Sequence, residues 1–113
     1  MNYKDNLEIA KDAAREAGNF LLKNKLNKKE IFSEKGRDIK LELDRETEDL
    51  IRNKLSSTNI PVLGEEFGGE ISSEIEKWVI DPIDGTANYF RGLDQCCISI
   101  ALMAKNESKI GVV

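Results

Sequence analysis

The chain of 113 residues has no histidine and only two cysteines, two prolines and one tryptophan. Histidine is the usual general base and the usual partner of a nucleophilic cysteine. Its absence removes that base and that partner, so any hydrolysis would have to depend on metal-bound water. The cysteines, Cys96 and Cys97, are adjacent in an expected strand, where neighbouring side chains point to opposite faces. We therefore expect two small buried hydrophobes in a reducing compartment, the cytoplasm, and no mutual disulfide.

Long apolar runs and an excess of positive charge are also missing. The longest strongly apolar stretch, Cys96–Ala104, is far too short to span a membrane, and the N-terminus opens no apolar run of the signal-peptide type. With 17 basic and 21 acidic residues the net charge is −4, which gives no reason to expect a nucleic-acid polymer as a partner. The length suits one small domain with a modest core.

What the chain does have is an apolar run, Trp78–Ile80, that leads directly into Asp81-Pro82-Ile83-Asp84-Gly85-Thr86. Residues three apart on an unbroken strand point to opposite faces, so Asp81 and Asp84 could not share a ligand there. Pro82 cannot donate to a central ladder and is typical of strand ends or bulges. We therefore expect the strand to stop at Asp81 and the chain to turn, so that both carboxylates converge at the strand's tip.

The end of this motif favours an anion site. Asp84-Gly85 is typical of a tight turn, which would leave the N–H groups of Gly85 and Thr86 directed at an anion. Oxygen ligands beside backbone donors make up a site for magnesium and phosphate. The alternative interpretation of Asp84-Gly85 is an ordinary hairpin turn between Trp78–Ile80 and Asn88–Phe90.

A second acidic element precedes the first. Ile60–Gly64 is another short apolar run, and Glu65-Glu66 follows it directly. Two strands that deliver acids from their C-terminal ends suggest a ligand crevice of the open α/β type, although a Glu-Glu pair by itself is more often a solvated loop. Residues 65–86 contain seven acidic side chains and one basic one, so phosphate would be repelled unless divalent cations inverted the local field.

Taken together, these residues resemble the signature of the inositol monophosphatase family, which belongs to the lithium-sensitive, magnesium-dependent sugar and nucleotide phosphatases. The resemblance rests on Asp81–Thr86, on the preceding Trp78-Val79-Ile80 and on Gly64-Glu65-Glu66. It covers the N-terminal part of the family pattern, because family members are considerably longer. It implies two or three Mg²⁺ ions and a small phosphorylated metabolite as substrate: an inositol phosphate, a sugar bisphosphate or an adenosine bisphosphate.

The resemblance also implies a set of metal ligands. Glu65 is similar to the glutamate that binds metal and helps to activate the attacking water, Asp81 to the aspartate that bridges two metals, and Asp84 to a ligand of the second metal. The Ile83 carbonyl resembles the backbone ligand of the first. One ion would lower the pKa of a bound water, and another would stabilise the leaving oxygen during in-line phosphoryl transfer.

Phosphate binding is implied in the same way for Ile83, Asp84, Gly85 and Thr86. In this resemblance the N–H groups of Gly85 and Thr86 hold the phosphate. The Thr86 hydroxyl would also touch the nucleophilic water, which gives this residue a catalytic role besides its role in binding.

Asp44 resembles an aspartate at the start of the second helix that supports the water or a third metal. It joins Glu65 and Thr86 as the expected catalytic residues. From the residues alone, Asp44 is instead a helix N-cap followed by an acidic first turn, and the two roles are compatible. The family usually has Val-Thr where this chain has Lys40-Leu41, so a hydroxyl near Asp44 is missing.

The expected fold class is α/β in a mixed, layered α+β arrangement: two helices plus a mostly antiparallel sheet, forming the N-terminal part of a sugar-phosphatase-like fold. A capping box at Asp5–Glu8 should open the first helix, and Asp44 should open the second. Cys96–Lys105 and Lys109–Val113 should pair as a hairpin. By resemblance, residues 1–113 are the N-terminal part of one domain whose C-terminal half is absent.

Two functions follow from this. The family completes its second metal site with an aspartate of a Trp-Asp motif in the C-terminal half, and neither Asp94 nor Glu107 follows a tryptophan. We expect a magnesium-dependent phosphate-monoester hydrolase in complete form, inactive as these residues alone. The alternative is a non-catalytic metal-binding or assembly module that retains half of the phosphatase fold. The last residues, Ile110–Val113, are apolar and are typical of a strand that stops part-way along its length. A homodimer or another association through open strand edges is therefore consistent with the sequence.

Overall fold

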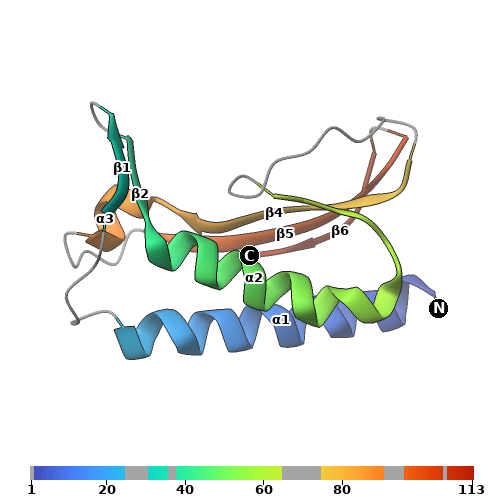
Figure 1. The fold of residues 1–113 in the computed structure, drawn as a ribbon. Helices are drawn as coiled ribbons and strands as arrows, with labels where there is room; N and C mark the ends of the chain where they lie inside the picture. The colour runs from blue at the N-terminus through green and yellow to red at the C-terminus, as the bar shows by residue number, and fades with distance from the viewer. Residues whose placement is uncertain (1, 25–30, 36–37, 65–74, 91–95, 106) are drawn as a thin grey trace.

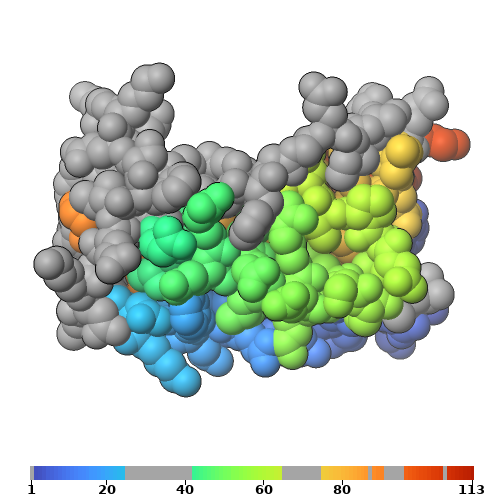
Figure 2. Space-filling view, in the orientation of Figure 1, coloured from blue at the N-terminus to red at the C-terminus, as the bar shows by residue number. Residues whose placement is uncertain are grey.

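A computed structural model describes residues 2–24, 31–35, 38–64, 75–90, 96–105 and 107–113. Two layers make up the molecule: a pair of long helices covers one face of a sheet, and a short two-stranded hairpin stands at one end (Figure 1). In the space-filling view, helix α2 lies across the front with helix α1 below it (Figure 2). Within the described ranges, no helix is long and apolar enough to cross a membrane.

The elements follow one another in a mixed α/β order. They are α1 (Tyr3–Asn24), β1 (Ile31–Lys35), β2 (Asp38–Leu41), α2 (Glu42–Leu55), a 3-10 turn (Ser56–Thr58), β3 (Val62–Gly64), β4 (Lys77–Asp84), α3 (Thr86–Phe90), β5 (Cys97–Ala104) and β6 (Glu107–Val112). β1 and β2 pair antiparallel. The larger sheet has the order β3-β4-β5-β6, with β3 and β4 parallel and the other pairs antiparallel. The predicted fold class, with two main helices and a mostly antiparallel sheet, is confirmed.

Both long helices begin earlier than the sequence suggested. Asn2 Oδ1 accepts a hydrogen bond from the Asp5 N–H at 2.9 Å, so Asn2 caps α1 and the predicted capping box is wrong. Helix α2 follows directly from β2 and begins at Glu42. Asp44 therefore lies inside the first turn with its side chain buried, and its predicted role as N-cap is wrong.

Strand β4 does not stop at Asp81, which corrects the sequence-based expectation. It continues to Asp84: Asp81 lies opposite Ser99 and Asp84 opposite Cys97, so β4 carries one residue more than β5 over this interval. This irregularity is a β-bulge, one of the two places where a proline is tolerated in a sheet. The predicted bend is present, but as a bulge within the strand.

The chain then turns at Gly85, whose φ of 91° favours glycine, and enters α3. The alternative interpretation as a hairpin turn is wrong, because residues 88–90 are helical and do not pair with residues 78–80. The predicted hairpin near the C-terminus is confirmed as β5 and β6. Its turn comes slightly earlier than expected, since Ala104 already lies opposite Glu107.

The main core lies between the helix pair and the sheet. Its buried side chains come from α1, α2 and three strands: Ala10, Ala13, Ala17, Ile51, Leu55, Trp78, Ile80, Ile100, Leu102 and Ile110. The small alanine side chains allow α1 to pack closely against its neighbours. A second cluster, built on Leu21, Ile83 and Tyr89, lies beside the bulge. The Tyr89 hydroxyl donates to the Leu21 carbonyl at 2.7 Å and so ties α3 to the end of α1.

Candidate metal and phosphate site

Four elements meet at one end of the sheet, and three of them, β4, α2 and α3, carry predicted site residues. Because β3 and β4 are parallel, their C-terminal ends lie at the same edge, and Gly64 at the end of β3 pairs with Ile80, one residue before Asp81. The first turn of α2 and the short helix α3 lie at this same end (Figure 1). The prediction that two strand ends meet here is confirmed as far as the strands are described, that is, to Gly64.

Thr86 connects α3 to α2. Its hydroxyl lies 3.0 Å from Asp44 Oδ1 and 2.9 Å from the carbonyl oxygen of Ile83. Both Asp44 and Thr86 are buried, with 1% and 8% of their surfaces exposed. A hydroxyl has one hydrogen and both neighbours are acceptors, so Thr86 can donate fully to only one of them at a time. Asp44 thus reaches the motif through Thr86, although 42 residues separate the two in sequence.

Asp81 and Asp84 lie on either side of the bulge in β4. Asp81 is half-buried, whereas Asp84 is exposed. The Cys97 thiol donates to Asp84 Oδ2 at 3.8 Å. Burial raises the pKa of Cys97, and the negative charges of Asp84 and Asp81 raise it further. The thiol therefore stays protonated at neutral pH, and its raised pKa reflects the negative charges at this end of the sheet.

The two cysteines differ in part from the sequence-based expectation. Both are free, as predicted, but neither is buried; both are half-exposed. Cys97 is the first residue of β5 and Cys96 directly precedes it, beside the irregularity in β4. The contact of Cys97 with Asp84 had no local signal in the sequence, because it depends on the register between β4 and β5.

Gly85 and Thr86 form the start of α3. The first bond of this helix runs from the Tyr89 N–H to the Gly85 carbonyl at 3.0 Å. The N–H of Thr86 precedes that bond and, like other amides in a first helical turn, has no partner supplied by the helix itself. This geometry is compatible with the predicted phosphate contacts, which stay a prediction.

Of the predicted metal ligands, Glu65 lies outside the described residues. Among the residues that are described, no three cysteine, aspartate or glutamate side chains come close enough together to hold a metal ion. The predicted ligands and supporting groups that the structure describes are all oxygen donors: the carboxylates of Asp44, Asp81 and Asp84 and the carbonyl of Ile83. Hard cations such as Mg²⁺ prefer such ligands, so the chemistry of the donor set fits the predicted ion.

Sequence reasoning missed Glu48, which is fully buried one helical turn after Asp44. Arg52 Nε donates to Glu48 Oε2 at 3.0 Å. The available signal was the spacing, because a glutamate four residues after Asp44 lies on the same helix face.

The family assignment comes from the whole chain. The sequence profile of the inositol monophosphatase family matches residues 2–113. The chain belongs to the inositol monophosphatase family. Members of this family are phosphatases, and the family is generally metal-dependent. That the residues at the end of β4 form the site of this family stays a prediction.

Named relatives show the range of the family. The chain is 38% identical to a fructose-1,6-bisphosphatase/inositol-1-monophosphatase of Aquifex aeolicus, over 99% of this chain and 44% of the relative. It is also 38% identical to the Nus factor SuhB of Xylella fastidiosa, over 97% of this chain and 41% of the relative. An IMPase of Thermotoga maritima has the same fold, with a TM-score of 0.84 and 31% identity, over 96% of this chain and 43% of that one. The chain thus spans less than half the length of these family members.

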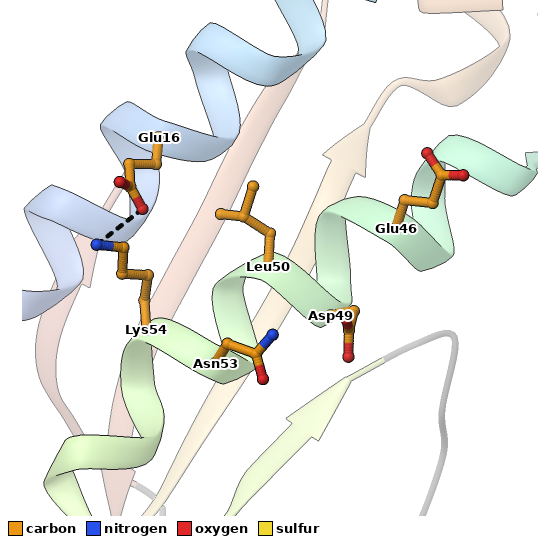
Figure 3. Close-up of a pocket in the computed structure, with 6 residues that line it drawn as sticks. All are labelled: Glu16, Glu46, Asp49, Leu50, Asn53 and Lys54. Carbon is orange, nitrogen blue, oxygen red and sulfur yellow. Dashed lines mark ion pairs between the residues drawn. The ribbon is translucent and has the colours of Figure 1, made fainter.

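A depression lies along the helix pair, away from the motif. It has a volume of about 440 Å³ and is lined by Glu16 of α1 and by residues of α2: Glu46, Asp49, Leu50, Asn53 and Lys54. Lys54 Nζ and Glu16 Oε2 form an ion pair across it at 2.9 Å, and Leu50 lies between the two helices (Figure 3). This exposed ion pair contributes little to stability, and the depression is an ordinary groove between packed helices.

Proposed function

We propose that the protein, in its full natural length, is a magnesium-dependent phosphate-monoester hydrolase. Residues 1–113 form the N-terminal part of its single catalytic domain. The observation that carries the proposal is the Thr86 hydroxyl, which is buried between the Asp44 carboxylate and the Ile83 carbonyl inside the family motif. Such a link joins a carboxylate to the residue expected to contact both phosphate and water.

The proposed ligand set uses oxygen donors only. Glu65, Asp81, Asp84 and the Ile83 carbonyl hold the metal ions, and Gly85 and Thr86 hold the substrate phosphate through their N–H groups. When bound, Mg²⁺ supplies Lewis-acid polarisation of the phosphate and a lowered pKa of bound water. Because the chain has no histidine, no other described group offers a general base near neutral pH.

The protein's own contribution is to orient groups. When the Ile83 carbonyl serves as a metal ligand, the Thr86 hydroxyl donates its hydrogen to Asp44. The lone pairs of Thr86 Oγ1 then point away from Asp44. A water molecule that donates to this oxygen is thereby held in a fixed position. The burial of Asp44 and Thr86 keeps this arrangement rigid, which is what a positioned nucleophile requires.

The proposed substrate is a small phosphorylated metabolite: an inositol phosphate, a sugar bisphosphate or an adenosine bisphosphate. The names of the Aquifex relative, an inositol-1-monophosphatase and fructose-1,6-bisphosphatase, support the first two classes. The acidic motif region also supports a substrate that binds together with cations rather than with basic side chains. Activity in the cytoplasm, without a membrane or a nucleic-acid polymer as partner, belongs to the same proposal.

The test is phosphate release by the full-length protein as a function of Mg²⁺ concentration. Asp81→Asn and Asp84→Asn are expected to lower kcat/KM at least ~100-fold, because each removes part of an electrostatic stabilisation worth several kcal/mol. Thr86→Val should lower it about 10–100-fold, as loss of an outer contact does. Glu107→Gln is the control, since Glu107 is exposed in β6 and pairs with Lys109 at 2.8 Å. Full activity of Asp81→Asn would contradict the mechanism.

A second candidate is a non-catalytic metal-binding or assembly module. The observation that favours it is the name of the Xylella relative, which is a Nus factor. This candidate predicts metal binding without turnover of any of the three substrate classes, and it predicts that Asp81→Asn leaves association with a protein partner intact. Multiple turnovers by the wild-type protein would rule it out as the sole function.

A further inference from the structure

Helix α2 carries a second buried carboxylate, Glu48, to which the proposed function gives no role. Its surface is 0% exposed, and it lies one turn after Asp44 on the same helix face. Removing a carboxylate from water costs several kcal/mol and is tolerated only where the group is paired. Arg52, one further turn along, supplies that pairing through Nε at 3.0 Å. The ion pair with Arg52 thus holds Glu48 in a fixed place on the helix.

The carboxyl group of Glu48 lies directly against Gly64. A Cβ atom placed on Gly64 would overlap Cδ and Oε1 of Glu48. Gly64, unlike Gly85, does not have a positive φ, so its backbone conformation does not require glycine. The reason for glycine at this position is therefore space: Glu48 occupies the volume that any larger residue would need.

This contact falls at the end of β3. Gly64 is the last residue of that strand and pairs with Ile80, next to Asp81. In the chain, it also directly precedes Glu65, a proposed metal ligand. Asp44 meets the end of β4 through Thr86, and Glu48 meets the end of β3 through Gly64. Two successive turns of one helix thus contact the ends of two neighbouring strands.

We propose that Glu48 is a positioning residue for the metal site. Arg52 holds the carboxyl group of Glu48 in place, and the backbone of Gly64 packs against that carboxyl group. This contact sets the separation between α2 and the end of β3. The separation in turn fixes the end of β3 relative to Asp44 and Asp81, which belong to the proposed site. This inference rests on the proposed function, because it concerns the same metal ions.

The test uses the full-length protein and two readouts of Mg²⁺. One is the Mg²⁺ concentration that gives half of the maximal rise in Tm without substrate, and the other is the concentration that gives half-maximal phosphate release. Glu48→Ala and Gly64→Ala are each expected to raise both concentrations about 10-fold, the usual effect of losing an outer contact of a metal site. Lys54→Ala, which breaks the exposed ion pair with Glu16 on the same helix, is the control and should change neither.

Two further variants separate positioning from simple stabilisation. In the double variant Glu48→Ala/Gly64→Ala, the new methyl group at residue 64 enters space that Glu48 has vacated. Its Mg²⁺ requirement should therefore lie closer to wild type than that of either single variant. Glu48→Gln keeps the size of the side chain and loses its charge. Because the contact with Gly64 depends on size, the Mg²⁺ requirement of this variant should stay within about threefold of wild type, well short of the ~10-fold increase in the single alanine variants.

Several results would overturn the inference. Single variants that lower Tm but leave both Mg²⁺ concentrations unchanged would show that Glu48 only stabilises the fold. Additive effects in the double variant, or a Glu48→Gln variant as impaired as Glu48→Ala, would show that the contact with Gly64 is not the cause. If wild-type protein itself responded to Mg²⁺ in neither readout, the proposed function would fail, and this inference with it.

Discussion

At the scale of single residues, polar groups are buried in pairs that join distant parts of the chain. Thr86 meets Asp44 across 42 positions, and Tyr89 meets the Leu21 carbonyl across 68. Each pair places a hydroxyl against an oxygen acceptor where water is excluded, so each hydrogen bond is costly to leave unmade. These two bonds hold the short helix α3, and with it the start of the proposed phosphate loop, against both long helices.

Tyr89 gives a pH prediction at this scale. Burial raises its pKa above 10.0, and the nearby Cys96 raises it further. Above pH 10 the unfolded chain loses the tyrosine proton first, so Tyr89 contributes stability that is complete below 10.0 and decreases as pH rises through its folded-state pKa. Tyr89→Phe should cost about 1 kcal/mol at neutral pH, through loss of the bond to Leu21.

The measurement is the urea midpoint of wild type and Tyr89→Phe at a series of pH values from 7 upward. The difference between the two proteins should shrink as pH rises beyond 10.0, because only the wild type carries this ionisation. Urea midpoints that stay a constant distance apart over that range would contradict the prediction. Other titrating groups are common to both proteins and cancel in the comparison.

At the scale of elements, glycines show which local conformations the fold requires. Gly18 lies within α1, and an added Cβ there would meet nothing within 4 Å. Gly85 joins β4 to α3 with a φ of 91°. Gly18→Ala is therefore expected to stabilise the protein by about 0.5–1 kcal/mol, because glycine in a helix interior costs that much relative to alanine.

Gly85→Ala should act in the opposite direction and destabilise by about 1–3 kcal/mol, since alanine tolerates that φ poorly. The free energies of unfolding in urea for wild type and the two variants give both values. The two substitutions add the same methyl group, so each serves as the control for the other. Equal shifts in the same direction would show that backbone conformation does not decide the effect.

At the scale of the whole molecule, residues 1–113 cover 41% and 44% of the lengths of two named relatives. Within the part of the chain that the structure describes, β3 and β6 are the outer strands of the sheet, and Val113 beyond β6 is 88% exposed. Unpaired strand edges favour association with further segments or chains. The resemblance implies that one ligand of the proposed second metal site comes from outside residues 1–113.

We therefore expect protein comprising residues 1–113 alone to show no multiple turnovers of inositol phosphates or sugar bisphosphates at saturating Mg²⁺. The full-length protein, assayed in parallel, is the positive control. Size-exclusion chromatography with light scattering should accompany the assay, because association through open edges would depend on concentration. Turnover by a monodisperse preparation of residues 1–113 would show that the described part of the site suffices.

Much of the site could be predicted from short stretches of sequence. The motif Asp81–Thr86 follows an apolar run, and this pattern alone indicated a strand delivering acids to one edge. Pro82 indicated an irregularity, because a proline cannot donate within a central ladder. Local pattern could not decide whether the strand would end or bulge, since that depends on whether β5 continues alongside it to Cys97.

The sequence by itself determined the family, the fold class and the identity of the acids at the proposed site, because these depend on residue type and spacing. Tertiary structure decided which groups meet: Thr86 with Asp44, Cys97 with Asp84, and Glu48 with Gly64. Each of these contacts joins separate elements, and strand register and helix packing, which arise only when the chain folds, set its geometry. The same reason explains Asp44, which appeared to be a helix cap in the sequence and is a buried acceptor in the fold.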